Sequence, residues 1–421
     1  MKDVLILGGG VIGLTMAHRL VKRGMSVAIV EASEQVGQGA GYANGALLTP
    51  SHSGPWNRPG VLFELLRSFV DPASTTKLRL AALPSISGWG MRFLRNSHPA
   101  RHAEASRQML EFALYSMQVF EEEYFGRIGQ EFDFARAGLL KIFRSEQELN
   151  AATRDFDNLA RHGLQMTRLD RSDAVAAEPT LSRIADQLAG ALWFPNDALG
   201  DTWKFCQVIE QDLRRQGVEI LTNTKVTGLL LEAGKVIGAK TANQDLLAQN
   251  TVLALGSKSV DLAHQVGVRL PVRPVKGYSV TFDGLSTDLM PRAAIADDRL
   301  HVGVIPIGDR LRVVGGVDFA GHNNLIDGRF IGNLMSVFSQ VFPDIDKEQL
   351  ADGRSEWSGF RPMSADGLPM IGACRYPGLW VNTGHGQLGW TLAAGAGEYM
   401  ADLLSGVAPA IEARFSDPKR S

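Results

Sequence analysis

The clearest chemical signature in this chain is a glycine turn near its start, in which Gly8, Gly10 and Gly13 have the spacing Gly-x-Gly-x-x-Gly. An apolar run at residues 3–7 precedes the turn, an amphipathic stretch follows it, and Glu31 ends a second predicted strand at 26–30. In a dinucleotide site the first glycine makes the tight turn, the second admits the pyrophosphate, and the third brings helix against strand. We therefore expect phosphates at the helix N-terminus and a ribose at Glu31.

A second glycine turn, Gly384-x-Gly386-x-x-Gly389, lies near the other end of the chain. A predicted strand at 379–382 precedes it and a predicted helix from about 390 to 404 follows, but no second strand ending in an acid comes after. Directly after Glu31, a glycine-dense loop at 37–45 allows the backbone to approach a ligand closely, although a flexible surface loop would have the same composition.

The overall composition is that of a globular protein large enough for two domains, with 421 residues, 45% hydrophobic and 21% charged. A formal net charge of −2 gives no support for nucleic-acid binding. Only Cys206 and Cys374 occur, far apart, which favours a reducing compartment without a disulfide framework. No segment resembles a signal peptide or a membrane span, so we expect the protein in the cytoplasm, either free or peripheral on the inner membrane face.

The remaining elements must position these turns. Residues 61–185 read as mostly helical, with one short strand at 137–143, and a helix at 200–216 precedes strands at 218–221, 226–231 and 235–240. A buried strand runs from 251 into Gly256, and the runs at 270–283, 300–306 and 311–317 suggest an antiparallel sheet. Because a strand, a glycine turn and a helix both open and close the chain, we predict a discontinuous cofactor domain.

The predicted fold class is α/β (α+β): a discontinuous Rossmann-like dinucleotide-binding domain with an inserted substrate domain on a mostly antiparallel sheet. We assign residues 1–60, 196–262 and 350–421 to the cofactor domain, and residues 61–195 and 263–349 to the substrate domain.

Motifs along the whole chain resemble one enzyme family. The N-terminal unit together with Gly24, Val27 and Gly37 resembles the extended fingerprint of flavoproteins. Further matches are Pro55-Trp56, Pro195-Asn196-Asp197, Lys276-Gly277-Tyr278-Ser279, Trp357-Ser358-Gly359-Phe360-Arg361-Pro362-Met363, Asp366-Gly367-Leu368-Pro369 and Leu388-Gly389-Trp390-Thr391. With these, the chain resembles the D-amino-acid dehydrogenase small subunit family, within the D-amino-acid oxidase and glycine oxidase superfamily of FAD enzymes.

The resemblance implies a non-covalent FAD and oxidation of an amino acid by hydride transfer from Cα to flavin N5. The resulting imino acid is hydrolysed to a keto acid and ammonia, and the electrons pass to a quinone or another carrier. By the same resemblance Arg361 binds the substrate carboxylate. Tyr278 either binds the same carboxylate or is a core residue, and His385 either faces the flavin edge or is structural. We expect no covalent flavin link, because the corresponding stretch holds Arg361 and no cysteine.

The cofactor contacts implied by the resemblance come from the glycine turns and the segments beside them. They are Gly8, Gly10, Val11, Ile12, Gly13, Glu31, Ala32, Ala43, Asn44, Gly45, Ala46, Val226, Ala254, Gly256, Gly384, Gly386, Gln387, Leu388, Gly389, Trp390 and Thr391. The helix after Trp390 is expected to direct its positive end at the flavin and stabilise its anionic reduced form.

Two departures from the family pattern affect the expected contacts. Residues 39–42, Gly-Ala-Gly-Tyr, lack the usual hydroxyl side chains, so backbone N–H groups would have to replace them at the pyrophosphate. His52 stands where the family tends to have an aromatic residue. If His52 faces the pocket, the substrate would be a cyclic imino acid such as D-proline or a hydroxyproline; otherwise His52 caps a surface loop.

Other functional alternatives also stay open on the sequence alone. The chain could be an oxidase that reduces oxygen, or an FAD subunit of a heteromeric complex. Arg92, Arg95, Arg101 and Arg107 lie among apolar residues between Trp89 and Arg107, which fits either a solvated basic face, the interpretation we favour, or a peripheral membrane patch. His98 and His102 have helical spacing, but Pro99 lies between them and no third ligand is evident, so we predict no metal site.

Overall fold

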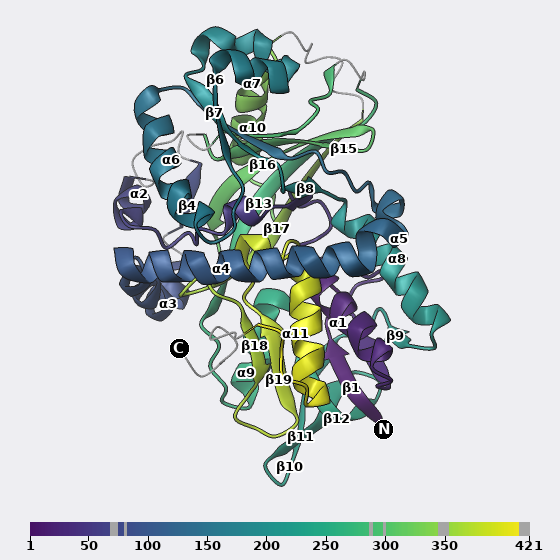
Figure 1. Ribbon diagram of the computed structural model, residues 1–421. Helices are drawn as coiled ribbons and strands as arrows, with labels where there is room; N and C mark the ends of the chain where they lie inside the picture. The colour runs from purple at the N-terminus through teal and green to yellow at the C-terminus, as the bar shows by residue number, and fades with distance from the viewer. Residues whose placement is uncertain (68–74, 80–81, 286–288, 298–299, 344–352, 412–421) are drawn as a thin grey trace.

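Two β-sheets with helices around them form the architecture of the chain (Figure 1). The computed structural model describes residues 1–67, 75–79, 82–285, 289–297, 300–343 and 353–411. The first sheet has a parallel core in the order β9-β2-β1-β12-β19. Its strands are β1 (Lys2–Leu7), β2 (Val27–Val30), β9 (Glu219–Leu221), β10 (Val226–Glu232), β11 (Lys235–Thr241), β12 (Asp245–Leu253), β18 (Met370–Ala373) and β19 (Leu379–Thr383).

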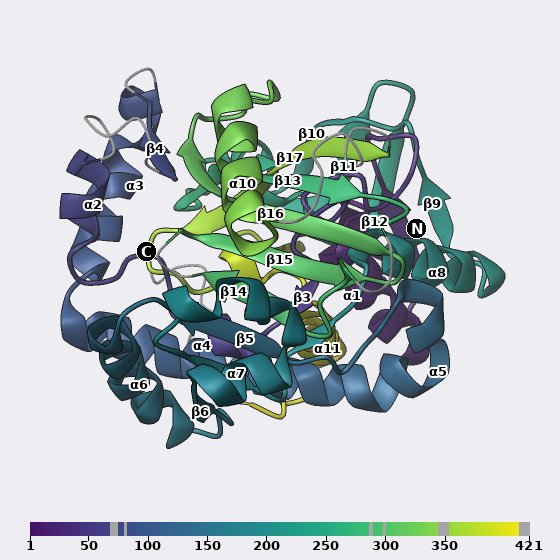
Figure 2. The same ribbon diagram turned by 90° about the horizontal axis from the view of Figure 1, so that it is seen from above.

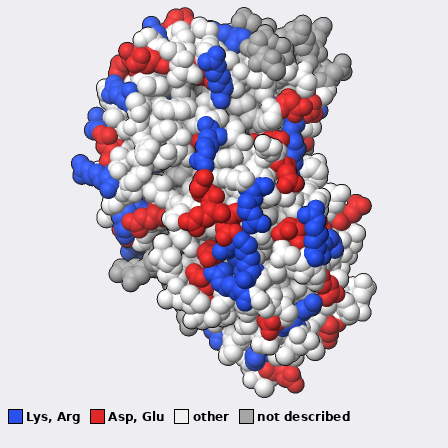
Figure 3. Space-filling view, turned by 45° about the vertical axis from the view of Figure 1, so that its right-hand side comes forward, with Lys and Arg blue, Asp and Glu red and all other residues white. Residues whose placement is uncertain are grey.

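The helices that pack around this sheet come from the start, the middle and the end of the chain. They are α1 (Val11–Lys22), α8 (Thr202–Arg215), α9 (Ser259–Gln265) and α11 (Ala393–Ser405). Helix α1 packs on α11, and Arg19 of α1 and Arg23, which directly follows α1, form ion pairs with Glu398 of α11. Figure 3 shows basic and acidic side chains side by side on the visible face. The N-terminal glycine turn is thereby fixed to the C-terminal segment.

The second sheet has the order β17-β13-β16-β15-β14-β5-β7-β6, antiparallel except between β14 and β5, and β4 adds in parallel to β16. Its strands are β4 (Thr76–Leu78), β5 (Leu139–Phe143), β6 (Thr167–Asp170), β7 (Gly190–Phe194), β13 (Val272–Phe282), β14 (Ala294–Asp297), β15 (Val302–Ile307), β16 (Arg310–Phe319) and β17 (Arg354–Ser364). Helix α10 (Gly328–Val341) packs on β13 and β16, as Figure 2 shows from above.

Helix α4 (Pro99–Phe120) crosses the molecule between the two sheets and packs on α11 (Figure 1). The other helices are α2 (Val61–Arg67), α3 (Leu83–Asn96), α5 (Gly126–Ile128), α6 (Glu146–Ala160) and α7 (Arg171–Ala177). A two-stranded ribbon, β3 (Leu47–Leu48) with β8 (Ala198–Leu199), and the 3-10 turn η1 (Pro50–His52) lie where the sheets meet.

The predicted fold class is confirmed, with three local differences. Strand β17 pairs with β13 along its length, so residues 354–364 belong to the second sheet although we assigned 350–421 to the cofactor domain. Strands β4 and β6 interrupt the region predicted as helical. The sequence did not indicate them, because three or four residues are too few to show the alternation of apolar and polar residues that marks a strand. Helix α11 begins at Ala393, after a 3-10 turn at Gly386–Leu388, rather than near Trp390.

Cys206 and Cys374 are both buried, and neither is part of a disulfide in the described residues. In the part of the chain that the structure describes, no helix is both long and apolar enough to cross a membrane.

Candidate functional site

The three glycines of the N-terminal turn have different surroundings. Gly8 has a φ of +114°, and a Cβ there would lie 2.5 Å from the Ala254 carbonyl oxygen. A Cβ on Gly13 would lie 2.0 Å from the carbonyl oxygen of Gly8, whereas one on Gly10 would meet no described atom within 4 Å. The first and third glycines are therefore required by packing, while the second borders open space. This cradle fits the pyrophosphate of a dinucleotide.

The start of helix α1 also suits an anion. Gly10 is the N-cap and supplies no side-chain hydrogen bond, so the first N–H groups, at Val11 and Ile12, have no side-chain cap. The carboxylate of Glu31 accepts hydrogen bonds from the N–H groups of Gly9 and Ser33, each at 2.8 Å, and Ala32 lies between. Glu31 thus borders the turn from the end of β2, as a ribose contact requires.

Hydrogen bonds from within the loop and from the second sheet fix the backbone of residues 43–46. The Asn44 side-chain oxygen accepts from the N–H of Ala46 at 2.8 Å, which supports the left-handed backbone of Ala46 (φ +51°). Ser279 donates to the Ala43 carbonyl at 2.8 Å, and Arg312 donates to the Asn44 carbonyl at 2.9 Å. Gly45 follows within this loop. Asn44 therefore shapes the loop, and Arg312 is a positioning residue that the sequence did not indicate.

The predicted contacts on the neighbouring strands lie beside the N-terminal turn. The N–H of Ala254 donates to the Leu7 carbonyl at 2.8 Å, and Thr383 donates to the Gly256 carbonyl at 2.8 Å. Val226 begins β10, two residues after Thr224, whose N–H donates to the Glu31 carbonyl at 2.9 Å. The first sheet therefore brings the ends of β1, β2, β12 and β19 together at one edge.

The C-terminal turn is fixed to the segment at 47–54. Gly384 and Gly386 have φ values of +78° and +57°. Gln387 donates to the carbonyls of His52 and Gly54, at 3.4 and 3.2 Å, and the N–H of Thr49 donates to the Thr391 hydroxyl at 3.0 Å. The turn closes over this segment and includes Gly389.

Two predicted cofactor contacts in this turn have core side chains. Trp390 donates from its indole N–H to the Gly200 carbonyl at 3.0 Å and packs among Phe120, Phe132 and Phe205. Leu388 is also buried in this core. Only the backbone of these two residues is available to a cofactor.

His385 is buried, and its Nε2 atom has no hydrogen-bond partner among the described residues. Burial lowers the pKa of His385 to about 3, so the imidazole is neutral at physiological pH. A buried polar atom without a partner costs about 1–3 kcal/mol, which a bound ligand would offset. The Nε2 atom of His385 could therefore form a hydrogen bond with a bound ligand.

Arg361 lies on β17 and spreads its guanidinium flat across Gly277 of β13. A Cβ on Gly277 would lie 2.3 to 2.4 Å from the Nη1, Cζ and Nη2 atoms of the guanidinium. Nη1 donates to the Gly316 carbonyl at 3.0 Å, and the indole of Trp56 lies 5.1 Å from the guanidinium carbon. Within the described residues, no acidic side chain forms an ion pair with Arg361. Burial lowers its pKa to about 10, so the side chain keeps its charge and can bind a carboxylate.

Tyr278 lies on the opposite face of β13 from Arg361. Its ring stacks on Phe330 of α10 at 4.5 Å, and its hydroxyl donates to Asp318 at 2.8 Å. Neighbouring residues of a strand point to opposite faces, so Tyr278 faces α10 while Gly277 faces the cofactor domain. The structure therefore places Tyr278 in the packing between β13 and α10, as in our alternative of a core tyrosine, and not on the face of Arg361.

His52 ends η1, and its Nδ1 atom lies 2.8 Å from the Thr49 hydroxyl. Thr49 and Ser51 both donate to the buried carboxylate of Asp197, at 2.5 and 2.6 Å. Burial raises the pKa of Asp197 to about 6, against the opposing effect of these hydrogen bonds. Asp197 anchors the segment that carries His52, a role that the sequence did not reveal.

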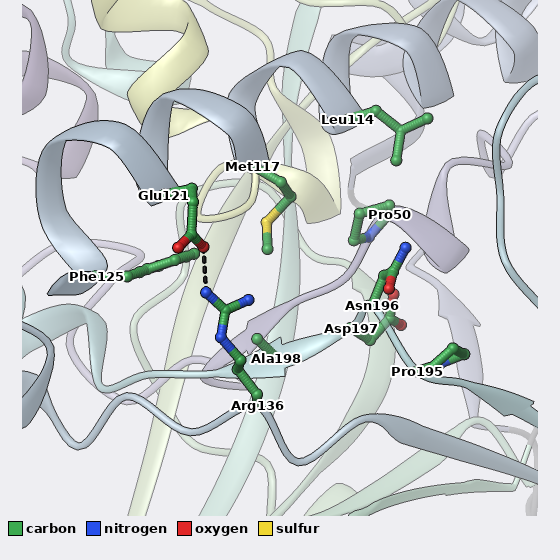
Figure 4. Close-up of a pocket in the computed structure, with 10 residues that line it drawn as sticks. All are labelled: Pro50, Leu114, Met117, Glu121, Phe125, Arg136, Pro195, Asn196, Asp197 and Ala198. Carbon is green, nitrogen blue, oxygen red and sulfur yellow. Dashed lines mark hydrogen bonds and ion pairs between the residues drawn. The ribbon is translucent and has the colours of Figure 1, made fainter.

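A cavity of about 380 Å³ opens on the other side of this segment (Figure 4). Pro50, Asn196 and Asp197 form one wall, and Leu114 and Met117 of α4 form another. Neither His52 nor Arg361 lines it, so it is separate from the site at Arg361.

Comparison with known proteins finds similarity over nearly the whole chain. The family model described as DAO, FAD dependent oxidoreductase, matches residues 3–403. A D-amino acid dehydrogenase from Vibrio cholerae serotype O1 (strain M66-2) is 33% identical over 415 residues, which cover 96% of this chain and 95% of that protein.

Two solved structures have the same fold. Glycine oxidase from Geobacillus kaustophilus superposes with a TM-score of 0.77 at 24% identity, covering 100% of this chain and 99% of the other. L-proline dehydrogenase from P. horikoshii has a TM-score of 0.76 at 17% identity, covering 100% and 97%. Both comparisons show that the fold is shared over nearly the whole of each chain.

Proposed function

The chain belongs to the DAO family of FAD-dependent oxidoreductases, and we propose that its substrate is a D-amino acid whose carboxylate Arg361 binds. The observation that carries this proposal is the charged guanidinium of Arg361, which has no acidic partner among the described residues. The D configuration rests on the relative from Vibrio cholerae, a D-amino acid dehydrogenase similar over nearly the whole chain.

FAD, when bound, supplies the oxidant that takes the Cα hydrogen of the amino acid as a hydride. The chain's own residues bind and orient the substrate. Arg361 pairs with the carboxylate in two parallel hydrogen bonds, while Gly277 and Trp56 fix the plane of the guanidinium. Because the electrons leave with the hydride, no side chain has to remove a proton from Cα, provided that the amine is neutral. Water then hydrolyses the imino acid to a keto acid and ammonia.

We propose that His385 and the backbone of the N-terminal turn hold the cofactor. The unpaired Nε2 atom of His385 would form a hydrogen bond with FAD, and Gly10, Val11 and Ile12 would receive its pyrophosphate. A quinone or another electron carrier would accept the electrons, at the surface of a membrane in the quinone case.

The test is anaerobic bleaching of the flavin absorbance by D- and L-amino acids, with D- and L-proline and the hydroxyprolines included. We expect D-alanine-type substrates to bleach the wild-type protein, and Arg361→Lys to raise KM strongly, because an ammonium cannot form the paired hydrogen bonds. If only the cyclic imino acids bleached the flavin, the substrate would instead be assigned as a secondary amine.

Two further results would overturn the proposal. Peroxide formed in air at the rate of substrate turnover would identify an oxidase rather than a dehydrogenase. Bound FAD that no amino acid reduces would identify a subunit that needs a partner for electron transfer.

A further inference from the structure

Large apolar side chains are exposed on two short neighbouring helices, α2 and α3. Of the twelve large hydrophobic side chains that are exposed among the described residues, five lie on these helices. They are Leu62, Phe63, Leu66, Met91 and Leu94, and we call them the α2–α3 surface. Phe63 and Met91 are 74% and 72% exposed. Such a concentration is typical of a surface that contacts another apolar phase.

The inner sides of the same helices are well packed, so their outward apolar residues are not needed for the core. Val61 of α2 and Trp89 and Phe93 of α3 are buried in one cluster. Trp89 stacks on Phe93 at 4.8 Å and donates to the Met363 carbonyl at 3.1 Å. Figures 1 and 2 both show α2 and α3 at one edge of the molecule, beside the N-terminal end of α4.

Exposed basic side chains lie on α3, one of the two helices that carry the α2–α3 surface, and on the start of α4. Arg92 and Arg95 of α3 and Arg101 of α4 are exposed, and none of them forms an ion pair within the described residues. Apolar side chains among unpaired arginines match the acyl boundary and the anionic head groups of a bilayer.

We infer that the α2–α3 surface docks on an anionic lipid bilayer. This inference rests on the proposed function in one respect, because a lipid-soluble quinone is the acceptor that would require such docking. The cluster beneath the surface also includes Met363 of β17 and the partly buried Trp56, whose ring contacts Arg361. One layer of side chains therefore separates the α2–α3 surface from the substrate site.

The first experiment is co-sedimentation of the FAD-loaded protein with vesicles. Vesicles of phosphatidylglycerol and phosphatidylcholine are compared with vesicles of phosphatidylcholine alone. We expect wild-type protein to bind the anionic vesicles and to be released by salt. Arg92→Glu/Arg95→Glu should weaken binding by at least about 25-fold, since each basic residue contributes about fivefold. Phe63→Ser/Met91→Ser should weaken it by about tenfold or more.

Matched control variants lie on strands β10, β11 and β12 of the first sheet. Leu231→Ser/Leu247→Ser removes two side chains that are 48% and 50% exposed, and Lys235→Glu/Lys240→Glu reverses two exposed charges. Both controls should bind vesicles like the wild type. Equal losses in the control and test variants would overturn the inference, because they would show a non-specific effect of charge or hydrophobicity.

A second readout separates this inference from the proposed function. With a water-soluble dye as acceptor, all variants should oxidise the amino acid at the wild-type rate, and with a quinone in anionic vesicles only the α2–α3 variants should be slow. A wild-type protein that is active with dye but never binds vesicles would refute the docking alone. If Phe63→Ser/Met91→Ser instead dissociated a dimer in solution, the surface would be an interface between two copies of the chain.

Discussion

The polar side chains on the two faces of strand β13 differ in how fully they are hydrogen-bonded or ion-paired. On the α10 face, the Tyr278 hydroxyl donates to Asp318, and Arg79 forms two hydrogen bonds with the same carboxylate at 2.8 and 2.6 Å. On the other face, the guanidinium of Arg361 lies over Gly277 with one backbone carbonyl and one aromatic ring as its contacts. One face has a complete set of partners, and the other has a charge that a ligand must complete.

In this protein, the number of polar partners separates a structural side chain, Tyr278, from a candidate ligand-binding side chain, Arg361. Burial alone would not separate them. An ion pair with matching hydrogen bonds contributes to a fixed fold, whereas an unmatched charge in a partly buried place costs free energy that only a bound counterion returns. The variants below test this distinction.

The largest effect is expected for Gly277→Ala. The added Cβ would displace the end of a flexible side chain, so we expect the fold to persist while the guanidinium moves by an ångström or more. A misplacement of this size lowers kcat/KM by about 100-fold. The measurement is steady-state kinetics with D-alanine and a dye.

Gly332→Ala on α10 is the matched control, because a Cβ there meets no described atom within 4 Å. Unchanged kinetics in Gly277→Ala would mean that the position of Arg361 above Gly277 has no part in substrate binding.

On the opposite face, Tyr278→Phe should affect stability rather than catalysis. Removing a hydroxyl that donates to the carboxylate of Asp318 should lower the free energy of unfolding by about 1.5–3 kcal/mol. Urea unfolding of the FAD-loaded protein measures this change, and kcat/KM should stay close to that of the wild type. A loss of kcat/KM as large as that of Gly277→Ala would instead show that Tyr278 contributes to substrate binding or catalysis.

A smaller effect concerns Asp197, a buried carboxylate that accepts hydrogen bonds from the hydroxyl groups of Thr49 and Ser51 and from the N–H of Ser51. Its pKa of about 6 in the fold exceeds the ordinary value of 3.8, so the folded state holds this proton more tightly. Its contribution to stability is complete below about pH 4 and is lost as the pH rises through 6.

Between pH 5 and 7 this loss amounts to about 1 kcal/mol in the free energy of unfolding. Asp197→Asn should remove that part of the pH dependence, which urea unfolding at several pH values would measure. An identical pH dependence in both proteins would contradict the raised pKa.

The sequence predicted the N-terminal turn well because its determinants are local. Gly8, Gly13 and Glu31 lie within 31 residues, and strand, turn and helix follow one another directly. Arg361 came from a resemblance to a family. Its support from Gly277 and Trp56 depends on strand pairing and on contacts across more than 80 residues, which no periodic pattern encodes.

Tyr278 shows what the sequence alone leaves open, since it allowed both a substrate contact and a core position. Its neighbour Gly277 faces Arg361, and a shift of one residue along β13 moves a side chain to the other face of the sheet. The pairing with β16 also shifts register between Lys276 and Tyr278, beside Gly316. Asp197 was recognised as part of a motif, but its role became visible only through its hydrogen bonds with Thr49 and Ser51.

The most direct test of the central claim is the discrimination between D-alanine and D-alaninamide, which lacks the carboxylate, measured as anaerobic rates of flavin reduction. Wild type and Tyr278→Phe should prefer D-alanine strongly and to the same degree. In Arg361→Ala the preference should fall by roughly 30-fold or more, since removing one member of such a pair costs about 2–5 kcal/mol. A preference that survives unchanged in Arg361→Ala would contradict the assignment of Arg361 as the carboxylate-binding residue.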